Sequence, residues 1–120
     1  MSLQIVGKIG EEYAKKYLLS LEYSIREQNY RTKLGEMDII AEKDNKIYFC
    51  EVKTRIGDLH GKPYEAVTYR KLQHIQRVAQ AYLLQNKIKS SKLSVQVISI
   101  ELFPDMTVKK MKMYEVQSLY

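Results

Sequence analysis

Residues 35–53 read GEMDIIAEKDNKIYFCEVK, two runs of alternating apolar and polar residues separated by Asp44 and Asn45. Alternation with a period of two is typical of β-strands, because successive side chains point to opposite faces. Asp and Asn tolerate the left-handed backbone that a two-residue hairpin loop requires. The stretch therefore predicts an antiparallel hairpin. One of its faces is expected to carry Met37, Ile39, Ala41, Tyr48, Cys50 and Val52.

The open end of this hairpin is predicted to gather four ionisable side chains on the other face. With Asp44 and Asn45 as the loop, Asp38 faces Glu51 and Glu36 faces Lys53. Two opposed carboxylates repel each other, and Mg²⁺ or Mn²⁺ would relieve this because hard cations bind carboxylate oxygens together with water and phosphate.

We therefore expect a metal at Asp38 and Glu51, with Lys53 orienting an attacking water or stabilising charge that develops on a phosphate. The alternative is an ion-pair cluster in which Lys53 neutralises Glu36 and Asp38.

Upstream of the hairpin, apolar residues recur with helical spacing over residues 6–21. Glu11 lies on the same stripe as Gly7, Ala14 and Leu18, so an acid faces inward. We expect Glu11 to bind a second metal or a metal-bound water. A buried acid satisfied by a neighbouring cation or by backbone donors is the alternative interpretation.

The remaining elements are predicted from periodicity and from turn residues. They are an extended segment over residues 24–31, a turn over 32–35, a helix from Pro63 to about Asn86, and strands over 95–102 and 107–116. The pattern predicts the α/β class. We expect one domain over residues 1–120, because two domains of half this length would each have too small an interior.

The formal net charge of +6 favours a polyanionic partner through phosphate contacts. The second helix is predicted to carry a basic face that consists of Arg70, Lys71, His74 and Arg77. This face either contacts a phosphate backbone or is simply exposed to solvent. Lysines in the last strand form either a basic patch or the charged edge of a sheet; they are Lys109, Lys110 and Lys112. If nucleic acid binds, we expect contacts from Arg31, Lys33, Arg55 and Lys71.

Several classes of site are disfavoured. Cys50 is the single cysteine, which excludes an internal disulfide and a zinc cluster and fits a reducing cytoplasm. His60 and His74 have no third ligand in register for zinc. Residues 7–10 match the GXXG loop of KH modules but fall within the helical pattern. No signal peptide or membrane-spanning run is expected, and hence no membrane contact.

The hairpin sequence GEMDII at residues 35–40, followed by FCEVKTR at 49–55, strongly resembles the YraN-like family, uncharacterised protein family 0102. The similarity runs nearly end to end, and includes Gly10-Glu11, Asn29-Tyr30-Arg31 and Lys71. That family resembles the PD-(D/E)XK nuclease superfamily and is similar in layout to archaeal Holliday-junction resolvases.

The resemblance implies a restriction endonuclease-like α-β-β-β-α-β core, with a mixed central sheet and an additional C-terminal strand. It also implies that Glu11, Asp38, Glu51 and Lys53 are the catalytic residues, and that the first three bind metal. Met37 stands where the superfamily has a proline, and Gln96 lies near a position where the family often has an aspartate.

Three functions follow as expectations. The leading one is Mg²⁺-dependent hydrolysis of phosphodiester bonds in DNA, with branched or damaged DNA as candidate substrates. The second is a nucleic-acid-binding module that keeps the nuclease fold without turnover. The third is an interaction protein in which the acids form only an ion-pair network. A homodimer is expected by analogy with the resolvases.

Overall fold

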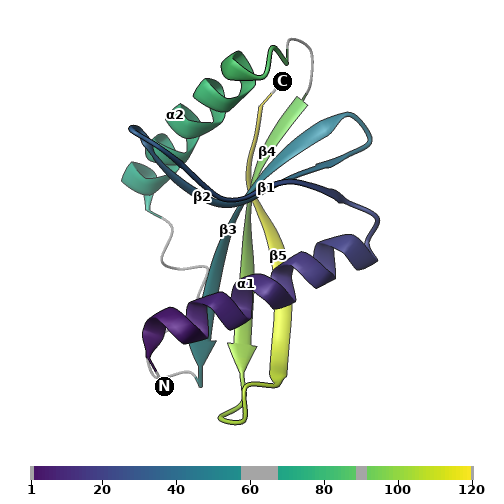
Figure 1. Ribbon diagram of the computed structural model, residues 1–120, viewed down its shortest axis with the longest axis vertical. Helices are drawn as coiled ribbons and strands as arrows, with labels where there is room; N and C mark the ends of the chain where they lie inside the picture. The colour runs from purple at the N-terminus through teal and green to yellow at the C-terminus, as the bar shows by residue number, and fades with distance from the viewer. Residues whose placement is uncertain (1, 58–67, 89–91, 120) are drawn as a thin grey trace.

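Two helices and five strands account for the described part of this computed structural model, residues 2–57, 68–88 and 92–119 (Figure 1). In chain order they are α1 (Leu3–Ser20), β1 (Ser24–Thr32), β2 (Gly35–Lys43), β3 (Lys46–Ile56), α2 (Tyr69–Gln85), β4 (Lys92–Leu102) and β5 (Val108–Leu119). The predicted α/β class and the α-β-β-β-α-β order with an added C-terminal strand are confirmed. The expected start of the second helix at Pro63 lies outside the described residues.

The strands form one mixed sheet in the order β1-β2-β3-β4-β5. Neighbours joined by tight turns are antiparallel, whereas β3 and β4 are parallel and are connected through α2. Strand β4 is buried along nearly its whole length, and its buried residues include the polar Ser94, Gln96, Ser99 and Glu101. Lys109 and Lys110 are exposed on β5, an edge strand, where charge opposes pairing with another chain.

The predicted hairpin loop is confirmed, because Asp44 and Asn45 both adopt positive φ angles, 52° and 61°. From this loop the paired positions of β2 and β3 run as predicted to Ile39 and Cys50, where the pairing stops. Beyond this point β2 stays with β1, and β3 stays with β4. We call the place where β2 and β3 part the fork, and Figure 1 shows the two strands leaving it in different directions.

Each helix covers a different face of the sheet, and two hydrophobic clusters result. The α2-side cluster contains Met37, Ile40, Ile47, Phe49, Ile75, Val78, Ala79, Tyr82, Leu93 and Val95. The α1-side cluster contains Val6, Ala14, Leu18, Ile39, Ala41, Cys50, Ile98, Ile100 and Leu102. The prediction that Met37 shares a face with Ile39 is therefore wrong. Strict alternation fails between them at Asp38, whose side chain accepts a hydrogen bond from the Val52 N–H of β3 at the fork.

Helix α1 reaches the fork through a close contact between Gly10 and β3. A Cβ atom built on Gly10 would collide with the side chain of Thr54, so only glycine allows the helix to lie this close. One residue later the helix presents Glu11 at the boundary between buried and exposed surface. The close packing of helix on strand therefore fixes the position of this acid relative to β3.

We expect Gly10→Ala to lower the free energy of unfolding by about 1–3 kcal/mol, the usual cost of overpacking. Gly7→Ala is the matched control, because nothing lies within 4 Å of a Cβ built on Gly7. That control should raise stability by up to about 1 kcal/mol through helix propensity. Unfolding in guanidinium chloride measures both. Equal effects of the two substitutions would contradict the close contact.

Candidate active site

At the fork, the side chain of Asp38 replaces a partner of the β-ladder. Oδ2 of Asp38 accepts a hydrogen bond of 2.7 Å from the backbone N–H of Val52 in β3. The main chain of β2 no longer pairs with Val52 at this point. The predicted register holds as far as Ile39, but Asp38 and Glu51 do not form the expected ladder pair. The expected pairing of Glu36 with Lys53 is also wrong: Glu36 instead lies 3.6 Å from Arg31.

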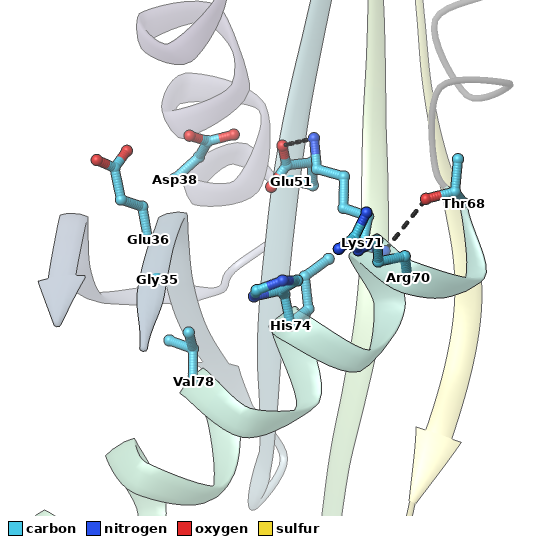
Figure 2. Close-up of a pocket in the computed structure, with 10 residues that line it drawn as sticks. Gly35, Glu36, Asp38, Glu51, Thr68, Arg70, Lys71, His74 and Val78 are labelled. Carbon is cyan, nitrogen blue, oxygen red and sulfur yellow. Dashed lines mark hydrogen bonds and ion pairs between the residues drawn. The ribbon is translucent and has the colours of Figure 1, made fainter. Parts of the chain in front are cut away.

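A cleft of about 440 Å³ opens beside the fork, between the open ends of β2 and β3 and the first turns of α2. It is lined by Gly35, Glu36, Asp38, Glu51, Thr68, Arg70, Lys71, His74, Ile75 and Val78. Figure 2 shows that its acids come from the strands and its basic side chains from α2. The cleft thus has an acidic wall and a basic wall that face each other.

Glu51 is the largely buried acid of this cleft, and two lysines approach it. Lys71 Nζ lies 2.7 Å from Glu51 Oε1, and Lys53 Nζ lies 3.5 Å from the same oxygen. The placement of Lys53 beside Glu51 agrees with the prediction that both project from one face of β3. The contact between Lys71 and Glu51 was not predicted. The sequence indicated only that Lys71 lies on the basic face of the second helix and is a candidate phosphate-binding residue.

Like charges at the fork shift the protonation of its acids. Burial, together with the nearby Glu51 carboxylate, raises the pKa of Asp38 from 3.8 to about 7, against the opposing hydrogen bond from Val52. Burial and the same Glu51 charge also raise the pKa of Glu11. The charge of Glu51 thus influences both Asp38 and Glu11, and a bound cation would favour the ionised forms of these two acids.

The two lysines differ in their electrostatic surroundings. Burial and the adjacent Lys71 ammonium lower the pKa of Lys53. Burial opposes the charged form of Lys71 as well, but its contact with Glu51 outweighs burial and raises its pKa. Lys71 is therefore the counter-ion that Glu51 keeps charged, whereas Lys53 releases its proton more readily than an exposed lysine.

A second cleft, of about 640 Å³, lies on the other side of Asp38, between the beginning of α1 and the strands β1 and β2. Its lining residues are Gln4, Gly7, Lys8, Glu11, Asn29, Arg31, Glu36 and Asp38. Asn29 has a positive φ of 51°, and its side-chain hydrogen bond to Glu11 partly opposes the rise in the pKa of that acid. Asn29 is not among the predicted site residues, although it lies in the Asn29-Tyr30-Arg31 segment that contributes to the family resemblance.

The structure thus brings together most of the predicted site residues. Asp38 and Glu51 line the first cleft, Lys53 contacts Glu51, and Glu11 reaches Asp38 from the second cleft. Lys71 and Arg31 also line these clefts. Lys33 and Arg55 are not among the described residues that line either one.

Gln96 lies outside the site. Its backbone pairs with Cys50, whose side chain packs in the α1-side cluster, so Gln96 is on the face opposite Glu51. Its side chain donates a hydrogen bond of 2.7 Å to Ser94 Oγ.

The donor set suits a hard divalent cation. Asp38 and Glu51 supply carboxylate oxygens to the first cleft and Glu11 supplies them to the second, and a cation would relieve the repulsion that raises the pKa of Asp38 and of Glu11. Over residues 2–57, 68–88 and 92–119, no three His, Cys, Asp or Glu side chains lie close enough to enclose a metal ion. Mg²⁺ commonly binds through one or two carboxylates and keeps several waters, so the residues at the fork fit this ion.

Replacing Asp38 by Asn is expected to stabilise the metal-free protein, and to do so more strongly at high pH. The pKa of Asp38 in the folded protein is about 7, above its ordinary value of 3.8. Folded protein therefore keeps a proton that the unfolded chain loses, and wild-type stability falls as pH rises from about 4 to about 7. We expect a gain of about 2–4 kcal/mol for Asp38→Asn at about pH 8, and a smaller gain at about pH 5.

Urea unfolding in the presence of a chelator measures this difference. Asp44→Asn, in the exposed hairpin loop, removes a carboxylate from the same hairpin outside the clefts and should show no comparable pH-dependent gain. A gain for Asp38→Asn that is the same at both pH values would contradict the electrostatic account.

Comparison with known proteins shows the family to which this chain belongs. The family model described as "Uncharacterised protein family UPF0102" matches residues 10–100, which include Glu11, Asp38, Glu51 and Lys53. A UPF0102 protein of Alkaliphilus oremlandii (strain OhILAs) is 48% identical over 99 residues, covering 81% of this chain and 85% of that protein. A UPF0102 protein of Caldanaerobacter subterraneus subsp. tengcongensis is 40% identical over 100 residues, covering 83% and 82%. The chain therefore belongs to the uncharacterised protein family UPF0102.

Proposed function

We propose that this protein is a Mg²⁺-dependent phosphodiesterase that acts on DNA. The observation that carries the proposal is the cleft at the fork, where carboxylates from β2 and β3 face Arg70, Lys71 and His74 from α2. The acidic wall suits a cation, and the basic wall suits the phosphate that shares this cation. The positive net charge of the chain supports a polyanionic substrate.

Each residue has a separate task in this reaction. Asp38 and Glu51 would hold the ion, and Glu11 would hold a second ion or a water from the side of the second cleft. A bound Mg²⁺ supplies polarisation of the phosphate and a lowered pKa of bound water. Lys53, whose pKa is lowered by burial, is suited to accept or orient a proton of the attacking water and to stabilise charge on the phosphate oxygens.

Cleavage of labelled DNA tests the proposal. Single-stranded, duplex, flap and four-way substrates are incubated with Mg²⁺ or Mn²⁺, and we expect cleavage of at least one of them. Lys53→Ala should reduce the rate by roughly a hundredfold or more, the usual loss when one charge-stabilising donor is removed. Asp38→Ala should abolish cleavage.

Two control variants keep the test specific. Glu12→Gln changes an exposed acid next to Glu11, and Asp44→Asn changes the hairpin loop, so both should cleave at the wild-type rate. Cleavage that persists unchanged in Asp38→Ala or in Lys53→Ala would show that the assignment is wrong.

One observation favours a second function, a nucleic-acid-binding module without turnover. Lys71 and Lys53 already neutralise Glu51. The acids of the cleft could therefore serve in an ion-pair network without any metal. In such a protein DNA binding would fall steeply with salt and would survive the removal of Asp38. Metal would then have little effect on stability.

Thermal melting separates the two functions. If Mg²⁺ or Mn²⁺ binds at the fork, a concentration 100 times its dissociation constant should stabilise the folded protein by roughly 2.7 kcal/mol. In a domain of this size the melting temperature then rises by several degrees. Asp38→Asn should lose this increment. Identical melting curves with and without both metals, together with salt-dependent DNA binding, would favour the binding module.

We also propose that the protein acts in the cytoplasm. Across the described residues, neither helix is long and apolar enough to cross a membrane. The single cysteine, Cys50, is buried and free, which suits a reducing compartment.

A further inference from the structure

The basic wall of the cleft holds one side chain whose position the proposed reaction does not explain. Lys71 Nζ lies 2.7 Å from Glu51 Oε1, within the acidic wall where the metal is expected. Figure 2 shows the Lys71 side chain extending from the first turn of α2 across the cleft to Glu51. A cation therefore competes with a fixed ammonium for the same carboxylate.

The backbone of Lys71 is anchored whereas its side chain has room to move. Its N–H donates a 3.1 Å hydrogen bond to Oγ1 of Thr68, the N-cap of α2. The side chain is 32% exposed, while that of Glu51 is 11% exposed. A lysine side chain with four methylene groups can thus swing within the cleft without any change in the helix.

From this geometry, and resting on the proposed function, we propose that Lys71 is a substrate-binding residue that exchanges partners. In the metal-free protein its ammonium neutralises Glu51 in place of the metal. When a divalent cation binds there, Lys71 leaves Glu51 and contacts a non-bridging oxygen of the bound phosphate on the basic wall. Metal and phosphate would then bind cooperatively, because the Lys71 ammonium is free to contact the phosphate only when a metal ion occupies Glu51.

The neighbouring cations do not share these features. Lys53 lies farther from Glu51, at 3.5 Å, and is on the same strand, so it does not link the two walls. Arg70 lines the cleft on the basic side, and no acid among the described residues forms an ion pair with it.

The metal half of the exchange is tested with Mn²⁺ alone, whose free concentration is followed by electron paramagnetic resonance. Lys71→Met should tighten Mn²⁺ binding by roughly tenfold, because the competing charge is removed. Lys71→Gln should do the same, which guards against a folding defect in one variant. Arg77→Gln removes a positive charge from an exposed position of the same helix, outside the cleft, and should change the affinity by less than about twofold.

The phosphate half is tested by binding of duplex DNA in Ca²⁺ and in a chelator. Lys71→Met should weaken binding by roughly fivefold or more in Ca²⁺ but less than about twofold in the chelator, where Glu51 already neutralises Lys71. An equal loss under both conditions overturns the exchange.

The outcomes separate this inference from the function on which it rests. Unchanged or weaker Mn²⁺ binding by both Lys71 variants, with normal binding by the wild type, overturns the exchange and leaves the metal site intact. If neither the wild type nor any variant binds Mn²⁺, the proposed metal site fails and the exchange fails with it.

Discussion

The hydrogen bond from the Val52 N–H to the Asp38 carboxylate is the constraint on which the site depends. When two strands part, each leaves backbone groups without a partner, and a buried unpaired N–H costs about 1–3 kcal/mol. Asp38 satisfies one such group with a side chain, so β2 and β3 can separate without that loss. The cleft exists because the strands separate, and the acid that permits the separation is the acid that faces the cleft.

This solution has an electrostatic cost. Asp38 is largely buried, close to Glu51, and the shift in its pKa shows that its charged form is disfavoured. The cost is tolerable because the sheet carries apolar clusters on both faces, and each fully buried aliphatic side chain contributes roughly 1.5–3 kcal/mol. The core therefore maintains an arrangement of acids that would not be stable on an isolated hairpin. Such stored repulsion is common where a fold serves chemistry rather than stability alone.

Much of the architecture followed from local patterns. The alternating residues and the Asp44-Asn45 loop predicted the hairpin and its register as far as Ile39, and helical spacing predicted both helices. The same reasoning placed Glu51 and Lys53 on one face, which the structure confirms. Local periodicity succeeds here because backbone hydrogen bonding and burial dictate these choices directly.

The errors arose where local rules stop applying. Alternation assumes that β2 and β3 pair along their whole length. It therefore placed Met37 on the wrong face and paired Glu36 with Lys53, although the pairing of the two strands ends at Ile39, next to Asp38. The Lys71 contact depends on how α2 docks on the sheet, and a helix that is distant in sequence leaves no spacing signal within the hairpin. Identifying such a contact requires the tertiary arrangement.

The parallel pairing of β3 with β4 also bears on how the cleft is assembled during synthesis. The acidic wall belongs to a hairpin that is complete in sequence by Ile56, whereas β4 begins at Lys92, after α2. Hairpins form within microseconds, but a parallel pair must wait for its crossover helix and the closing of a long loop. The nascent chain thus contains the whole acidic wall before the basic wall on α2 has been synthesised, and the last described residue that lines the cleft is Val78.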